Sequence, residues 1–163
     1  MAAGSTYTPI ATTTVGTATN TVTFSSISGS YTDLVIVING IASGGGMNPI
    51  IQFNGDTASN YSLTWVYGNG TSAFSNRYSS QTSSYIGYLS SSEQGNIILQ
   101  VQNYSNTTTN KTTLFRWNTV SIESGAGVAL WRNTAAITSI SFKTSANNYG
   151  VGTTFTLYGI AAA

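Results

Sequence analysis

The chain has 163 residues, of which five are Lys or Arg and four are Asp or Glu, and it contains neither histidine nor cysteine. The lack of cysteine excludes disulfides and thiolate zinc sites, and the lack of histidine removes the commonest general base and metal ligand. A net charge of +1 without a basic stripe argues against nucleic-acid binding, and no apolar run approaches the length of about 18 residues that a membrane span needs. We therefore expect no cofactor, no nucleic-acid partner and no membrane partner.

Short runs rich in Val, Ile, Thr and aromatic residues predict β-strands along the whole chain, and no window keeps helical spacing. The predicted strands cover 7–12, 21–26, 33–41, 49–54, 61–67, 85–89, 96–102, 112–121, 128–132, 137–143 and 153–160. Gly, Asn and Ser clusters between them favour tight turns. This pattern indicates an all-β fold, a single-domain antiparallel β-sandwich of about 8–11 strands that is jelly-roll-like. The domain spans 1–163, with a short arm at 1–6 and a tail at 161–163.

The strand at 33–41 is unusual because its centre, 34–38, is apolar on both faces. A sandwich strand normally shows water one polar face. Val35 and Val37 lie on the face opposite the core, so we expect a terminal segment or a second subunit to cover them. Since so few charges oppose association, we favour a second subunit and take Val35 and Val37 as the oligomer interface.

Two strands have a clear division of faces. In 61–67, Tyr61, Leu63, Trp65 and Tyr67 share one face. In 112–121, the aromatic residues at 115 and 117 share one face, and the polar residues at 116 and 118 share the other. We interpret the tryptophans and most tyrosines as core residues.

The irregular stretch 68–84 is the best candidate for an external contact surface, because Tyr with Ser, Gly and Asn is typical of binding loops. The candidate receptor or glycan contacts are Phe74, Arg77, Tyr78, Gln81 and Tyr85, together with Tyr149 on the loop 143–152. Core or intersubunit packing is the alternative for the group around Tyr78.

Catalysis has little support in this sequence. The acids Asp33, Asp56, Glu93 and Glu123 form no recognisable pair, and paired carboxylates are what a glycosidase needs. The Gly-Ala-Gly at 125–127 precedes a predicted strand rather than a helix, so it is not a phosphate loop. We expect no enzymatic activity and no catalytic or metal site, with a glycosidase as the less favoured alternative.

Several phrases occur in a characteristic order. They are Tyr-Thr-Asp-Leu-Val at 31–35, Phe-Asn-Gly-Asp at 53–56, Asn-Tyr-Ser at 60–62, Leu-Trp-Arg-Asn-Thr-Ala-Ala-Ile at 130–137 and Phe-Thr-Leu-Tyr-Gly-Ile at 155–160. In this order the chain resembles a small β-rich virion domain of cyanophages and other marine tailed phages, usually described as a fibre or structural protein. The resemblance implies a trimeric β-sandwich on the phage particle, without enzymatic residues to carry over.

A virion location agrees with the start of the sequence, which shows no secretory signal, because virions assemble in the host cytoplasm and leave by lysis. The expected partners are further copies of the chain, other virion proteins and host surface glycans. Two tasks stay open, a short tail fibre module for host attachment and a head (capsid) decoration protein. A free carbohydrate-binding lectin is the alternative from another class.

Overall fold

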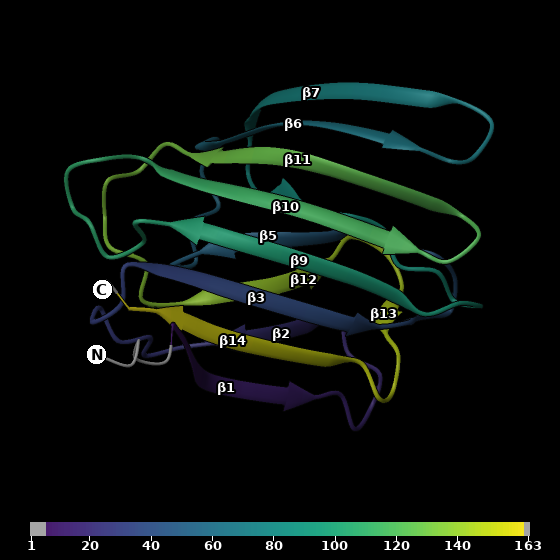
Figure 1. Cartoon of the computed structure of the whole chain (residues 1–163), viewed down its shortest axis with the longest axis horizontal. Coiled ribbons are helices and arrows are strands. Elements are labelled where there is room, and N and C mark those ends of the chain that lie inside the picture. Colours follow the sequence, from purple (N-terminus) through teal and green to yellow (C-terminus); the bar gives the residue numbers. More distant parts are fainter. Residues whose placement is uncertain (1–5, 162–163) are drawn as a thin grey trace.

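Two antiparallel sheets packed face to face form the structure, a computed structural model that describes residues 6–161 (Figure 1). The large sheet has eight strands in the order β1-β14-β3-β9-β10-β11-β6-β7. In that order the strands are Tyr7–Thr14, Thr154–Ile160, Asp33–Gly40, Gly95–Gln102, Lys111–Thr119, Glu123–Trp131, Tyr61–Gly68 and Ala73–Gln81. The predicted arm at 1–6 and tail at 161–163 lie almost entirely outside the described residues.

The small sheet has four strands in the order β2-β12-β5-β8, which are Thr21–Phe24, Ile140–Thr144, Pro49–Phe53 and Ser84–Tyr85. A further two-stranded sheet pairs β4 (Ala42–Ser43) with β13 (Asn148–Tyr149). In the sequence, β4 falls between β3 and β5, and β13 falls between β12 and β14. No helix within residues 6–161 is long and apolar enough to cross a membrane.

The strand order is that of a jelly roll with a widened sheet. The chain alternates between β1-β14-β3-β9 of the large sheet and β2-β12-β5-β8 of the small sheet, which gives eight strands in two facing sheets of four. Two hairpins, β6–β7 and β10–β11, are inserted in this framework and extend the large sheet by four strands. The predicted fold class is therefore confirmed, and the hairpins are its main elaboration.

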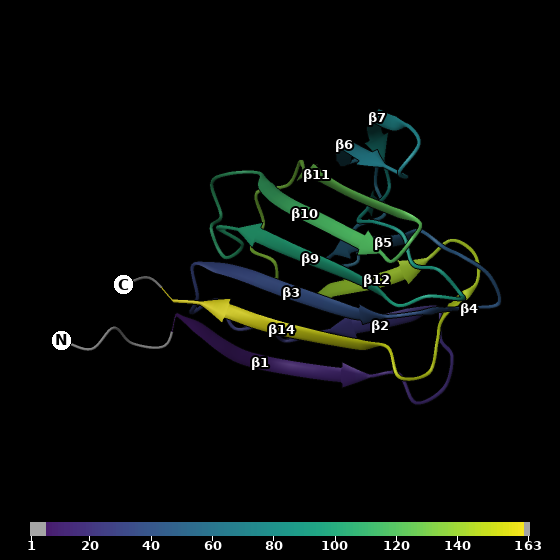
Figure 2. The same cartoon turned by 45° about the vertical axis from the view of Figure 1, so that its right-hand side comes forward.

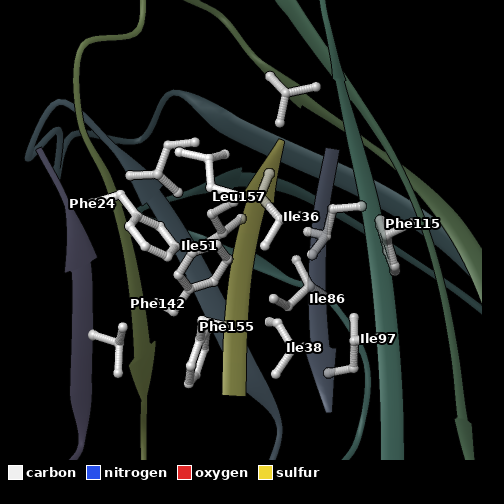
Figure 3. Close-up of a cluster of buried hydrophobic side chains, with 14 of the residues drawn as sticks. Phe24, Ile36, Ile38, Ile51, Ile86, Ile97, Phe115, Phe142, Phe155 and Leu157 are labelled. Carbon is white, nitrogen blue, oxygen red and sulfur yellow. The ribbon is translucent and has the colours of Figure 1, made fainter. Parts of the chain in front are cut away.

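The core lies between the inner faces of the two sheets. Figure 3 shows Ile36 and Ile38 of β3 packed among the phenylalanines of the small sheet and of β14. Phe142 and Phe155 meet across the sandwich with ring centroids 5.4 Å apart. Burial of these side chains, at about 25 cal/mol per Å² of apolar surface, is the main driving force for the fold.

A carboxylate holds one corner of the sandwich. Asp56 accepts hydrogen bonds from the indole Nε1 of Trp131 at 2.7 Å, from Asn60 Nδ2 at 2.8 Å and from the backbone N of Ala58 at 2.8 Å. The hydrogen bond from Asn60 is the largest cause that lowers the pKa of Asp56, with further help from Trp131 and Ala58. The neighbouring Tyr61 is buried, which raises its pKa to about 12.

The predicted strands agree with the observed ones in most places, and the differences are local. The stretch 68–84, expected to be irregular, contains β7, because this polar segment pairs along its backbone with β6 as an exposed edge strand. β11 begins at Glu123 rather than at 128 and so takes in the Gly-Ala-Gly segment. Over 85–89 the strand is short, with only a further bridge between Leu89 and Met47.

Candidate functional site

The widened large sheet creates a cleft on its inner face. In both Figures 1 and 2, β11, β6 and β7 extend past the strands of the small sheet. At one end of these strands, Tyr61 and Trp131 pack on Phe53 of β5. Farther along, the inner face borders the short edge strand β8 and the segment after it. The cleft has a volume of about 400 Å³. Its lining consists of Asn48, Trp65, Tyr67, Asn76, Tyr78, Tyr85, Gly87, Tyr88, Phe115, Trp117 and Glu123.

Two glycines of β11 make room for the aromatic rings of the cleft. Gly127 lies opposite Phe115 and Trp65 on the neighbouring strands, and a Cβ there would come within 2.4 Å of Phe115 Cζ. Gly125 lies between Trp117 and Tyr67 in the same way, and its Cβ would come within 2.4 Å of Trp117 Cη2. Because β11 has no side chains at these two positions, it forms the floor of the cleft, and rings from β10 and β6 extend over it.

The rings form two neighbouring groups. Trp65, Tyr78 and Tyr85 make mutual contacts, with centroids 5.1 Å apart for Trp65–Tyr78 and 6.2 Å apart for each of the other two pairs. Tyr78 is 42% exposed and Tyr85 is 36% exposed, so this group presents ring surface to water. In the second group, Tyr67 contacts Trp117 at 6.3 Å, and Trp117 stacks on Phe115 at 6.0 Å.

Polar groups accompany the rings. Glu123 accepts a hydrogen bond from Trp117 Nε1 at its Oε1, at 2.9 Å, while its Oε2 has no hydrogen-bond donor among residues 6–161. Asn48 donates from Nδ2 to the carbonyl oxygen of Gly87 at 3.2 Å, which fixes the amide at the wall of the cleft. The amide of Asn76 is exposed on β7. The arrangement offers flat apolar surface, one carboxylate and two amides to a ligand.

Most of the predicted contact residues fall near this cleft. Tyr78 and Tyr85 line it, and Phe74 stacks on Tyr67 at 4.8 Å next to it. Arg77 alternates with Tyr78 along β7 and therefore faces the opposite side of the sheet. Gln81, at the end of β7, donates from Nε2 to the Ser79 carbonyl and is turned back onto its own strand. Phe74, Arg77, Tyr78 and Gln81 thus lie on β7 rather than on the expected loop, and Tyr85 lies on β8, at the start of the strand predicted over 85–89.

The prediction for Tyr149 is wrong. This residue was expected at the tip of an exposed loop, but its side chain is fully buried. Its ring meets Phe155 edge-on at 4.9 Å, and its hydroxyl donates to the Lys143 carbonyl at 3.3 Å. The reason is the pairing of Tyr149 with Ala42, which folds the loop back against the end of the sandwich.

Sequence reasoning missed most of the cleft walls. Trp65 was interpreted as core, whereas it is half-buried and faces the cleft; Trp117 and Trp131 are buried, as expected. Glu123 was considered only as an unpaired acid. The Gly-Ala-Gly segment was the available signal, because small residues opposite aromatic positions of a strand indicate space filled by rings.

Val35 and Val37 lie on the outer face of the large sheet, which is turned toward the viewer in Figure 1. No described segment lies over this face, so a terminal segment within residues 6–161 does not cover it. Val35 is nevertheless only 8% exposed, because its cross-strand neighbours Tyr158 and Gln100 flank it within the sheet. Apolar residues of five neighbouring strands form the outer apolar patch on this face, namely Val35, Val37, Val66, Ile98, Leu114 and Val128.

Comparisons with known proteins give only distant likeness. No protein-family model matches the sequence, and no curated protein matches it. The solved alginate lyase Aly36B aligns with a TM-score of 0.33 and 8% identity, over 80% of this chain and 68% of that chain. Domains LG4-5 of the mouse laminin alpha1 chain align with a TM-score of 0.29 and 13% identity, over 90% of this chain and 40% of that chain. Alignments at this level carry no argument about ligand or activity.

Proposed function

We propose that this chain is a non-enzymatic, glycan-contacting β-sandwich of a tailed-phage particle, of the short-fibre, host-attachment kind. The observation that carries the glycan contact is the open aromatic cleft. A sugar ring has an apolar face of C–H groups and an equator of hydroxyls. Trp65, Tyr78 and Tyr85 offer surface for the first, and Asn48, Asn76 and Glu123 offer hydrogen-bonding groups for the second. Ligand sites are typically of this kind, mostly apolar with a few placed polar groups.

The same cleft argues against glycoside hydrolysis. The usual mechanisms need two carboxyl groups flanking the scissile bond, at about 5–10 Å from each other. Among the described residues that line the cleft, Glu123 is the single carboxylate. Asp56 is held at a corner of the sandwich by Trp131 and Asn60, and Asp33 accepts hydrogen bonds from Gln100 and Asn103 N. We therefore assign Glu123 to binding.

The proposed virion location rests on the resemblance in phrase order to small β-rich proteins of marine tailed phages. The low charge fits the same setting, because a surface of hydroxyls and amides packs readily against neighbouring subunits. Between the two virion tasks, the cleft favours host attachment over head decoration, since a lattice-bound decoration protein needs no exposed aromatic site.

Self-association through the outer face is the second component of the proposal, with further copies of this chain as the occupant. Eight strands at about 4.8 Å spacing and seven residues at about 3.3 Å give a face of about 34 by 23 Å. This area, close to 800 Å², matches what a stable interface buries on each partner. The outer apolar patch lies near the centre of this face, with Gln100 between Val35 and Leu114 and with Arg116 next to Ile98. Arginine is enriched at interfaces, so its presence among apolar residues agrees with a contact between subunits. In a trimer, each patch would face the three-fold axis.

A glycan array with labelled protein tests the binding component. Wild type is expected to bind a subset of glycans, and Tyr78→Ala and Tyr85→Ala, both at the exposed rim, are expected to lose at least tenfold in affinity. Val120→Ala is the control, because Val120 is an exposed apolar residue outside both the cleft and the outer apolar patch. Binding that is unaffected by both cleft variants would contradict the proposal. Antibody labelling of intact particles tests the location, with label expected at the tail, and label on the head or none would refute it.

A further inference from the structure

The cleft carries a negative charge that no positive charge among its described lining residues balances. Among its lining residues in the described chain, Glu123 is the charged one, and no lysine or arginine accompanies it. The strands that form the cleft do carry two arginines, Arg77 on β7 and Arg116 on β10. Both alternate with inward-facing residues and so point to the opposite face of the sheet. The sheet itself therefore separates these cations from the ligand site.

The Glu123 side chain is held in place, so it cannot easily move toward a neutralising cation. Its Oε1 is held by the indole of Trp117 at 2.9 Å, and the Trp117 ring is fixed by its stack on Phe115. The carboxylate is half-buried, where charges interact more strongly than in bulk water. Its Oε2 has no donor among residues 6–161, so it remains available to accept from a ligand.

These features point to a class of ligand for the site, and the inference rests on the glycan contact proposed above. We infer that the cleft selects uncharged hexose chains, whose hydroxyls donate to Glu123, and rejects chains of uronic acids. A uronate carboxylate near Glu123 would face a like charge and find no arginine or lysine in the lining to compensate it. Placing like charges together is an effective way to exclude a wrong partner.

Isothermal titration calorimetry with hexasaccharides tests this selectivity. The neutral probes are malto-, cello- and mannohexaose, and the acidic probes are hexamers of galacturonate and of mannuronate, all at low salt. We expect the best neutral probe to bind at least tenfold more tightly than either uronate, which corresponds to about 1.4 kcal/mol. Raising the salt concentration is expected to narrow the difference, since salt screens exposed charges.

Glu123→Gln is the decisive variant, because its amide oxygen can still accept from Trp117 while the charge is gone. It is expected to reduce the discrimination to threefold or less. Asp33→Asn is the matched control, since it removes one negative charge on the outer face, and it is expected to leave the discrimination unchanged.

Each other outcome has a definite meaning. A uronate that binds as well as the neutral probes, or discrimination that Glu123→Gln leaves intact, overturns the selectivity while the glycan contact itself stands. If no hexasaccharide of either kind binds, both the selectivity and the proposed glycan contact are wrong.

Discussion

Asp56→Ala is the sharpest test of how the sandwich corner is held. The substitution removes the acceptor of three hydrogen bonds, from Trp131 Nε1 at 2.7 Å, Asn60 Nδ2 at 2.8 Å and Ala58 N at 2.8 Å. For two of these donors the lost hydrogen bond costs little, because the Asn60 amide and the Ala58 backbone N–H lie near the surface and can donate to water instead. The indole N–H of Trp131 cannot, since that side chain is 1% exposed.

The expected loss of stability follows from this difference. A buried donor left without a partner costs about 1–3 kcal/mol, and the lost charge-assisted bonds to the two outer donors add about 1 kcal/mol more after solvent replaces them. We expect Asp56→Ala to lower the free energy of unfolding by about 2–4 kcal/mol. For a domain of this size, that shift corresponds to a fall in Tm of about 5–15 °C.

Urea denaturation followed by tryptophan fluorescence measures this change. Asp33→Ala is the control, because Asp33 also accepts two hydrogen bonds, from Gln100 and Asn103, yet lies on the outer face of the large sheet. We expect the control to cost under about 1 kcal/mol. Surface substitutions usually change stability by less than about 0.5 kcal/mol, so an Asp56→Ala protein within that range of wild type would refute the reasoning. An Asp56→Ala protein no less stable than Asp33→Ala would refute it as well.

Asp56 also predicts a dependence on pH. Its hydrogen-bond donors, Asn60 first, lower the pKa of the carboxyl from its ordinary value of 3.8. The ionised form is thus favoured in the folded state, so the stabilisation is complete above pH 3.8 and is lost as pH falls through the folded-state pKa. In Asp56→Asn this loss is absent, so the two unfolding free energies should converge as the solution is acidified. A constant difference down to pH 2 would count against this account (about two pH units below the ordinary pKa).

Three further predictions concern the floor of the cleft, the outer face and the buried tyrosine. Gly127→Val should destabilise the fold by about 1–3 kcal/mol and distort the cleft, because the Cβ of the valine would collide with Phe115 and with the neighbouring strand. A thermal melt with the Tm of wild type would contradict this prediction. Leu114→Lys, in the outer apolar patch, should shift the sedimentation-equilibrium mass from trimer to monomer at micromolar protein concentration, because burying an unpaired charge disfavours association. Val120→Lys, at an exposed valine outside the patch, should leave the trimer intact, and a monomeric wild type would disprove the interface. Tyr149→Ala should lower the free energy of unfolding by about 3–5 kcal/mol in denaturant titration, and Tyr149→Phe should lower it by about 1 kcal/mol. Equal losses in the two variants would show that the hydroxyl, and not the packing of the ring, dominates.

Much of the fold could be predicted because the chain follows a period of two wherever one face is buried. The strand containing Leu34, Ile36 and Ile38 is the clearest example, since its inward residues are fully buried. The alternation in 61–67 and 112–121 also assigned the faces of Trp65 and Phe115 correctly. These assignments needed only the pleat of a strand and the drive to bury apolar surface.

The cleft could not be predicted in the same way, because it arises from which strands become neighbours. β11 brings Gly125 and Gly127 between β10 and β6, strands about fifty residues apart in the sequence. Their pairing places Phe115 and Trp65 on either side of one glycine. β7 was missed because most of its residues are polar and it is exposed on both faces, with Phe74 and Tyr78 as its only aromatic residues. Its strand conformation therefore depends on backbone pairing with β6 rather than on a buried hydrophobic face.

The chain has three tryptophans, and their positions allow one direct measurement of the central claim. Trp65 and Trp117 line the aromatic cleft, whereas Trp131 is buried at the corner with its Nε1 bonded to Asp56. Titration of ¹⁵N-labelled protein with the best neutral hexasaccharide should move the indole N–H signals of Trp65 and Trp117 in a saturable way and leave that of Trp131 in place. A saturable shift confined to Trp131, or binding by calorimetry with no change at Trp65 and Trp117, would show that glycans do not contact the cleft.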